Sequence, residues 1–259
     1  MFFFMFAKVK KIKTQYRNIV LKIKCFYLCR KISFFMKKQV IVVAGGSGRR
    51  MGLETPKQFI EVAGKPILLR TLENFHLFDS GMDIVVVLPE KEIERWKHLC
   101  RLFDCQIQHR IVEGGATRFQ SVKNGLKLAL PDAIIAIHDG VRPFVSHKTL
   151  TRCFDAAMQF GTAVPCVDII DSLRMTTNKG NCACDRSLFK AVQTPQVFKS
   201  ELLMAAYNQP FNSSFTDDAS VVETCSPIHL VEGDTDNIKI TTPFDLQMAE
   251  LILKSREKQ

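Results

Sequence analysis

The chain has 259 residues, of which 46% are hydrophobic and 24% are charged, the proportions of an ordinary globular protein. A chain of this length can bury most of its surface, so it needs neither disulfides nor a structural metal in order to fold. The net charge of +10 does not indicate nucleic-acid binding, because 11 of the 36 Lys and Arg residues lie within residues 1–38. The other 25 are balanced by 26 acidic residues, so the rest of the chain has a net charge of −1.

Residues 1–35 form an N-terminal extension that is basic, apolar and free of acidic residues. It contains no run of about 20 uncharged apolar residues, so we expect no simple membrane span. Three interpretations stay open: a membrane-surface or targeting segment, a disordered arm, or sequence that precedes the true start. Met36 lies just before the first predicted strand and favours the third. Under that interpretation, residues 1–35 are not part of the functional protein. A chain that begins at Met36 should then have the same catalytic turnover as the full chain.

The nine cysteines are an odd number, form no CxxC pair and have no histidine cluster beside them. This pattern predicts neither a disulfide framework nor a zinc site. Free thiols in a protein of the reducing cytoplasm are the expectation.

From Gln39 onward, short β-branched runs alternate with amphipathic segments. The predicted strands cover residues 40–44, 84–88, 107–112, 133–137 and 162–167. The predicted helices cover residues 67–78, 91–103, 117–130 and 147–160. Continuous apolar runs indicate strands that are buried on both faces. The alternation predicts one α/β domain over residues 36–259, with a Rossmann-like, mostly parallel sheet, helices on both faces and a ligand site at the carboxyl ends of the strands.

The stretch at about 168–191 interrupts this alternation. A short strand over residues 172–176, a polar turn over residues 178–181 and a second extended segment predict a protruding β-hairpin arm. The sequence leaves open whether the arm packs on a second subunit or faces solvent. Beyond it, we expect two further helical segments, a short strand and a last helix, over residues 200–208, 217–224, 229–232 and 243–254.

A glycine-rich and then basic loop, AGGSGRRMGLETPKQF over residues 44–59, follows the first predicted strand directly. Glycines at positions 45, 46 and 48 allow a phosphate to approach the backbone N–H groups closely. Arg49, Arg50 and Lys57 add positive charge that suits a polyphosphate. The loop matches neither the dinucleotide-binding fingerprint, which needs a glycine where Met51 stands, nor a Walker loop, which ends in Gly-Lys-Ser/Thr.

The pattern G-x-G-x-R-M followed by P-K-Q resembles the nucleotidyltransferases that activate sugars and sugar alcohols. Five further motifs follow along the chain: GGATRFQSV, HDGVRPF, QTPQVF, TDDAS and DNIKITTPFDL. They occur in the order found in the 2-C-methyl-D-erythritol 4-phosphate cytidylyltransferase family, and GGATRFQSV, with Arg118 and Ser121, resembles the cytidine-reading loop of that family. The resemblance covers about residues 39–254 and implies a cytidylyltransferase that joins CTP to a polyol phosphate. D-ribitol 5-phosphate stays open as the acceptor, because HDGVRPF and NIKITT suit either enzyme, and a catalytically silent nucleotide-binding regulator is the second alternative.

The resemblance also implies roles for individual residues. Arg50 and Lys57 would stabilise the charge that develops on the α-phosphate and pyrophosphate, and Lys239 would hold the α-phosphate and the attacking phosphate. Mg²⁺ or another divalent cation usually takes one or two carboxylates together with substrate phosphate oxygens. Asp139, at the end of a predicted strand, and Asp236 are the expected ligands.

The remaining expected contacts divide between the nucleotide and the acceptor. Those to the nucleotide come from Ala44, Gly45, Gly46, Gly48, Gly115 and Ser121. Those to the acceptor phosphate come from Arg142, Ser172 and Arg186, the last two reaching a partner's site across a homodimer formed through the arm. Ala116 stands where some relatives carry an acidic residue, so a side-chain contact to the ribose is expected to be missing. His138 is expected to support the neighbouring carboxylate and not to act as a general base.

Overall fold

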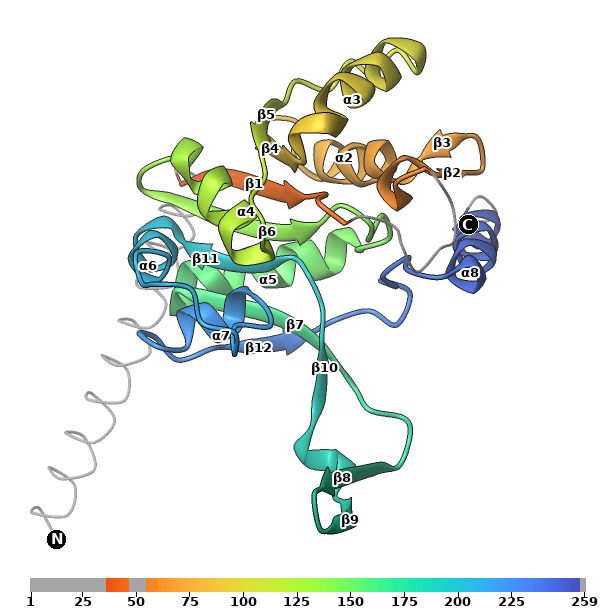
Figure 1. Cartoon of the computed structure of the whole chain (residues 1–259). Coiled ribbons are helices and arrows are strands. Elements are labelled where there is room, and N and C mark those ends of the chain that lie inside the picture. The colour runs from red at the N-terminus through yellow and green to blue at the C-terminus, as the bar shows by residue number, and fades with distance from the viewer. Residues whose placement is uncertain (1–35, 47–54, 257–259) are drawn as a thin grey trace, which may run out of the picture. The chain divides into compact units, whose positions relative to one another are not determined.

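One mixed sheet lies at the centre of the fold (Figure 1). The protein is represented by a computed structural model that describes residues 36–46 and 55–256. Within those residues, eight strands form the sheet: β1 Lys37–Val43, β4 Asp83–Leu88, β5 Arg110–Glu113, β6 Ala133–Asp139, β7 Thr162–Asp168, β10 Lys190–Val192, β11 Gln196–Lys199 and β12 Leu230–Glu232. Their order is β10-β7-β11-β6-β1-β4-β5, and β12 pairs with β7.

Residues 1–35 and residues 47–54 lie outside the described part of the chain. The predictions for the N-terminal extension and for Gly48, Arg49 and Arg50 therefore stay predictions. The body of the fold belongs to the unit Lys37–Gln259. None of its described helices is both long enough and apolar enough to cross a membrane.

The central strands β6, β1, β4 and β5 run parallel to one another. Their side chains are buried on both faces: Val40, Ile41 and Val42 of β1 have no exposed surface. This burial is what the continuous apolar runs predict. The predicted α/β fold with a mostly parallel sheet is confirmed, although β5 begins at Arg110 and not at residue 107, because residues 105–109 join no ladder.

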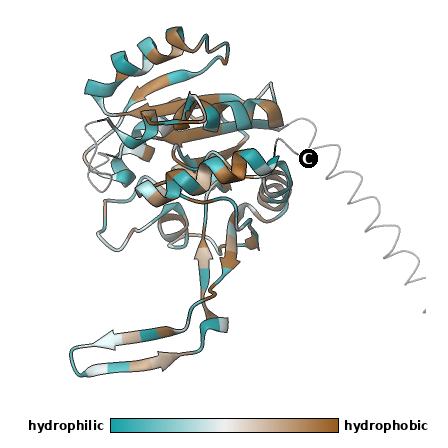
Figure 2. Ribbon diagram, turned by 90° about the vertical axis from the view of Figure 1, so that its right-hand side faces the viewer, coloured by the Kyte–Doolittle hydropathy of each residue, from teal (hydrophilic) through white to brown (hydrophobic). Residues whose placement is uncertain are grey.

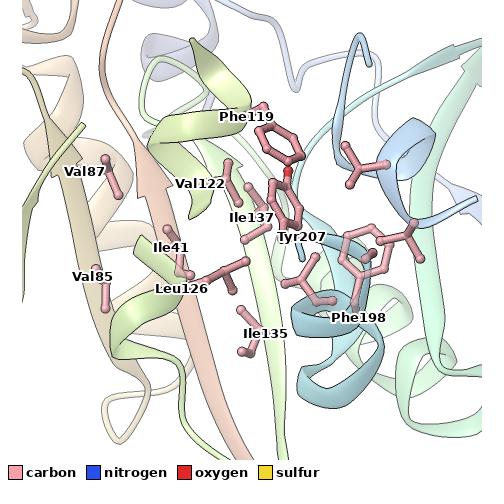
Figure 3. Close-up of a cluster of buried hydrophobic side chains, with 14 of the residues drawn as sticks. Ile41, Val85, Val87, Phe119, Val122, Leu126, Ile135, Ile137, Phe198 and Tyr207 are labelled. Carbon is pink, nitrogen blue, oxygen red and sulfur yellow. The ribbon is translucent and has the colours of Figure 1, made fainter. Parts of the chain in front are cut away.

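Helices cover both faces of the sheet (Figure 1). Their bounds are α2 Ile67–Phe78, α3 Glu90–Leu102, α4 Arg118–Gly125, α5 His147–Phe160, α6 Ser200–Ala206, α7 Asp218–Val222 and α8 Pro243–Arg256. α4, α6 and α7 pack on one face with the strand residues Ile41, Ile135 and Ile137 (Figure 3). α2 and α5 lie on the other face, where Phe78 stacks on Phe154 and Phe75 meets His138 of β6 edge-on.

Gly125 marks a tight contact between α4 and the sheet. A Cβ atom there would lie 2.7 Å from Cγ2 of Ile41 and 3.0 Å from Cγ2 of Val87, two β-branched side chains with little rotamer freedom. We expect Gly125→Ala to lower the free energy of unfolding by about 1–3 kcal/mol, measured by urea denaturation. Gly81→Ala is the control, because its Cβ would come no closer than 3.5 Å to Asp79 Oδ1. Equal stability of the two variants would contradict this close packing.

β11 is a strand that the sequence pattern did not predict. It lies between β6 and β7 and runs antiparallel to both. Both β10 and β11 pair with β7, but the two pairings are not in the same register. Val192 of β10 lies opposite Cys166, whereas Val197 of β11 lies opposite Ala163. The chain therefore advances five positions, from 192 to 197, while β7 advances only three, from 166 to 163. The extra residues lie within the segment that carries Thr194, whose side chain points toward the end of β6.

The predicted hairpin arm is present. Its strands β8 Leu173–Thr177 and β9 Gly180–Cys184 pair antiparallel with each other, and the 3₁₀ turn η4 Arg186–Leu188 lies between β9 and β10 of the sheet. Figures 1 and 2 both show the arm projecting away from the sheet. Large apolar side chains on the arm and at its base are exposed; they are Ile170, Met175, Leu188, Phe189 and Val192.

Candidate active site

Loops at the carboxyl ends of β1, β5 and β6 meet at one cleft of about 250 Å³. Because these strands are parallel, their ends lie at the same edge of the sheet. The residues that line the cleft are Val43, Ala44, Gly45, Gly46, Lys57, Gln58, Gly115, Ala116, Thr117, Arg118, Ser121, Asp139, Val141 and Lys239. Eight predicted site residues are thus brought together from separate segments: Ala44, Gly45, Gly46, Lys57, Gly115, Ser121, Asp139 and Lys239.

Asp139 is a carboxylate in the cleft around which three cationic side chains lie. Lys239 Nζ lies 2.9 Å from its Oδ2, Arg142 Nε lies 3.4 Å from the same oxygen, and Arg118 Nε lies 3.7 Å from Oδ1. Burial by itself would raise the pKa of Asp139, but Arg118, Lys239 and Arg142 outweigh it and hold that pKa well below its usual range. Asp139 is therefore ionised near neutral pH, and it is surrounded by an excess of positive charge.

A chain of hydrogen bonds fixes the backbone at Asp139. Its N–H donates to Thr194 Oγ1 at 3.1 Å, and Thr194 Oγ1 lies 3.1 Å from His138 Nδ1. His138 Nε2 lies 2.9 Å from the carbonyl oxygen of Arg142. A carbonyl can only accept, so Nε2 carries the proton and Nδ1 accepts from the Thr194 hydroxyl. Burial lowers the pKa of His138 to about 4, which leaves the ring neutral and both of its nitrogens occupied.

The segment that carries Lys239 is fastened to the same framework. Asn237 is fully buried and donates from Nδ2 to the carbonyl oxygen of Thr194 at 2.8 Å. Arg142 Nη1 donates to the carbonyl oxygen of Asn237 at 2.6 Å, and Ile240 N–H donates to that of Val141 at 3.0 Å. These bonds explain how a residue 100 positions beyond Asp139 in sequence comes within 2.9 Å of it.

Another part of the cleft lining comes from the turn before α4 and the start of that helix, with Gly115, Ala116, Thr117, Arg118 and Ser121. Ser121 Oγ accepts from Gly115 N–H at 3.1 Å and donates to the Thr117 carbonyl at 2.9 Å, which holds the turn before α4 closed. A Cβ at Gly115 would lie 2.0 Å from Gln120 Cγ, so only glycine fits this turn. A pocket of this kind offers backbone N–H and C=O groups in fixed positions to a planar base.

Lys57 enters the cleft across Gly46. A Cβ at Gly46 would lie 2.6 Å from Lys57 Cε, so the missing side chain is what lets the lysine pass. The short turn that carries Lys57, η2 Lys57–Phe59, is anchored by Phe59, which stacks on Trp96 of α3 with ring centroids 6.1 Å apart. Trp96 is fully buried, as a packing residue should be.

The other predicted site residues lie outside the lining of the cleft. Arg142 contacts Asp139 but is not part of the cleft lining, and Asp236 is exposed on the loop before Asn237. Ser172 and Arg186 are exposed on the arm, where Arg186 donates to the carbonyl oxygen of Ile170. Arg50 and Gly48 fall outside the described residues.

The sequence-based prediction gives Thr194 no role, and it includes Arg118 only as part of the loop that resembles the cytidine-reading loop of the family. Thr194, in QTPQVF, joins Asp139 to His138. Arg118, in GGATRFQSV, lines the cleft and contacts both Asp139 and Asp218. The only local signal for either was its place in a motif, because both partners of Arg118 come from distant segments.

A glycine-rich turn, converging lysines and one carboxylate at the edge of a parallel sheet define a nucleotide-handling α/β enzyme. The family model described as IspD, 2-C-methyl-D-erythritol 4-phosphate cytidylyltransferase, matches residues 38–255. The chain belongs to this family and is a CTP-dependent cytidylyltransferase.

Named relatives and solved structures agree with this assignment. Enzymes named 2-C-methyl-D-erythritol 4-phosphate cytidylyltransferase from Bacteroides fragilis and Bacteroides thetaiotaomicron are 50% and 49% identical over 219 residues, which is 84% of this chain and the whole of each relative. The crystal structure of the enzyme of that name from Thermus thermophilus has a TM-score of 0.69 at 32% identity and covers 85% of this chain and 100% of its own. These findings do not favour a ribitol-phosphate enzyme or a silent regulator.

Proposed function

We propose that this cleft transfers the cytidylyl group of CTP to 2-C-methyl-D-erythritol 4-phosphate, releasing pyrophosphate and forming 4-diphosphocytidyl-2-C-methyl-D-erythritol for isoprenoid precursor synthesis. The observation that carries the proposal is the convergence of Lys57, Lys239 and Asp139 on one backbone-lined cleft. Both reactants are anions, so the protein must offset their repulsion and align them. It needs no covalent nucleophile.

Each charged residue then has a distinct task. The acceptor phosphate attacks the α-phosphorus of CTP, and pyrophosphate leaves on the opposite side. Lys57, together with Arg50, stabilises the charge that develops on the α-phosphate and the leaving group. Lys239 holds the α-phosphate and the attacking phosphate near each other. No general base is required, because the attacking phosphate is already ionised, and this agrees with the neutral, fully bonded ring of His138.

The residues present fit a magnesium ion. Among the described residues Asp139 is the carboxylate that lines the cleft, and its lowered pKa keeps it in the ionised form that binds a cation. Magnesium usually takes one or two carboxylates and completes its shell with phosphate oxygens and water. We propose that Asp139 and the nucleotide hold the ion together, with the exposed Asp236 as the second candidate ligand. When bound, the ion offsets the negative charge of the phosphates.

Pyrophosphate release in the presence of CTP, magnesium and either acceptor tests the function. We expect turnover with 2-C-methyl-D-erythritol 4-phosphate and much slower turnover with D-ribitol 5-phosphate. Faster turnover of the ribitol compound would reverse the choice of acceptor. Tight binding of CTP without any release of pyrophosphate would support a silent regulator instead.

The described cysteines are all free, which suits the reducing cytoplasm that we propose as the location of the reaction.

We also propose that the arm pairs two copies of the chain into a homodimer. Ile170 and Leu188, which follow and precede the paired residues Asp168 and Lys190 by two positions, are each 79% exposed, an unusual degree of exposure for large aliphatic side chains. A second copy that covered them would bury this apolar surface. The same contact would bring Ser172 and Arg186 of one copy to the partner's cleft, as the family resemblance implies.

Arg186→Ala should raise KM for the acceptor more than KM for CTP, because Arg186 is expected to bind only the acceptor phosphate. Steady-state kinetics with each substrate varied in turn measure both constants. Arg174→Ala is the matched control, since Arg174 is also exposed on the arm but has no expected role.

A separate variant, Leu188→Asp, should shift the molecular mass measured by light scattering toward that of the monomer, because the aspartate would place a charge in the proposed apolar contact. A monomeric wild-type protein with full activity would contradict the dimer.

A further inference from the structure

Arg118 is held by a carboxylate that water cannot reach. Asp218 of α7 has no exposed surface; its Oδ2 accepts from Arg118 Nη2 at 2.6 Å, and its Oδ1 accepts from the hydroxyl of Tyr207 at 2.6 Å. A buried carboxylate must be paired, because an uncompensated charge in the interior is strongly destabilising. Asp218 therefore fixes one edge of the guanidinium group in place.

The rest of the guanidinium faces the cleft. The Arg118 side chain is 30% exposed and lines the cleft together with Gly115 and Ser121. A guanidinium carries five N–H donors, and among the described residues the one hydrogen bond that Arg118 donates is the bond to Asp218. Its Nε lies 3.7 Å from Asp139 Oδ1, within ion-pair range but beyond a normal hydrogen bond. Donors are therefore left over on the side that a ligand would occupy.

The charges around Asp139 indicate which ligand these donors suit. Three cations, Lys239, Arg142 and Arg118, are paired with only two carboxylates, Asp139 and Asp218, so this group of side chains carries one positive charge in excess. An anion that enters the cleft would balance it. Because the guanidinium is fixed in advance by Asp218, binding such an anion requires little ordering of the side chain.

The position of Arg118 selects one phosphate of the nucleotide. It begins α4, directly after the turn at Gly115 that we expect to hold the base, and it reaches Asp139 on the other side. The α-phosphate is the phosphate bonded to the nucleoside, so it lies between these two points when the base and the remaining phosphates are bound. We propose that Arg118, positioned by Asp218 and Tyr207, binds the α-phosphate of CTP. This inference rests on the proposed function.

Equilibrium binding of cytidine, CMP and CTP to the full-length protein, measured by calorimetry in EDTA, tests the proposal without turnover or metal. Arg118→Lys keeps the charge, but its single ammonium cannot contact Asp218 and a phosphate in the same forked manner. We expect Kd for CMP and CTP to rise about tenfold or more, the size of one charged hydrogen bond. The Kd for cytidine, which has no phosphate, should stay within about twofold.

A double variant guards against misfolding. Arg118→Gln combined with Asp218→Asn removes both members of the buried ion pair at once, so no uncompensated charge is left behind. It should show the same selective loss of CMP and CTP binding. Arg152→Lys is the matched control: Arg152 is 31% exposed and paired with Glu232 and Asp234, but it lies outside the cleft lining. Its three Kd values should equal those of the wild type.

The outcomes separate this inference from the function on which it rests. Unchanged CMP binding in Arg118→Lys, with wild-type binding intact, would overturn the role of Arg118 alone. Equal weakening of cytidine and CMP would also overturn it, because Arg118 would then shape the base pocket and not bind phosphate. A wild-type protein that bound none of the three compounds would remove the proposed function, and this inference with it.

Discussion

Replacing Asp139 by asparagine should lower kcat for pyrophosphate release by about 10²-fold or more, the usual effect of losing one preorganised charge at a reacting phosphate. Asparagine has nearly the same shape, so the hydrogen bond from the backbone N–H to Thr194 can persist. What is lost is the negative charge that faces Lys239, Arg142 and Arg118 and that would bind the divalent ion. Steady-state kinetics over a range of magnesium concentrations measure the effect.

The same substitution should not weaken the binding of CTP in EDTA. Without the Asp139 charge, the three cations around it lose the carboxylate that they share, so an anionic triphosphate should bind at least as tightly as in the wild type. Asp234→Asn is the control, because Asp234 is partly buried, lies 3.8 Å from Arg152 and does not line the cleft. It should leave kcat nearly unchanged. Loss of CTP binding together with activity would contradict the role given to Asp139 and indicate a collapsed site.

The buried strands and the longest helices follow from local signals in the sequence. α5 begins and ends where the pattern predicts, over residues 147–160, because Ser146 caps it through a hydrogen bond from Thr149 N–H and Gly161 ends it with φ of 88°. α4 is shorter than predicted: it ends at Gly125 and passes into the 3₁₀ turn Leu126–Leu128. Caps and periodicity act within a few residues, so a sequence shows them directly.

β11 depends on distant partners and could not be predicted in the same way. It is four residues long, and its pairing with β6 and β7 joins segments that lie far away in the chain. The same limit applies to the site. Motifs identified Asp139, Lys57 and Lys239, whereas the pair of Arg118 and Asp218 joins residues separated by 100 positions. Only the folded chain shows that this arginine is held by a buried carboxylate.

Replacing Lys57 by alanine should lower kcat by about 10²-fold or more, because it removes a charge that we place at the leaving pyrophosphate. Gly46→Ala offers an independent test of the same side chain. A Cβ at Gly46 would lie 2.6 Å from Lys57 Cε and 3.3 Å from its Nζ, so the methyl group would displace the ammonium. Only the far end of a flexible side chain has to move, so stability to urea should hardly change while kcat falls.

The two substitutions should not be additive, because both act through the position of one ammonium group. In Gly46→Ala/Lys57→Ala the methyl group has no lysine left to displace, so the double variant should be about as slow as Lys57→Ala alone. Pyrophosphate release by the wild type, both single variants and the double variant completes the cycle. Fully additive losses would mean that Gly46 serves the nucleotide independently of Lys57. In that case the cleft would need its glycine for close approach of the phosphate itself, and not for the passage of the lysine.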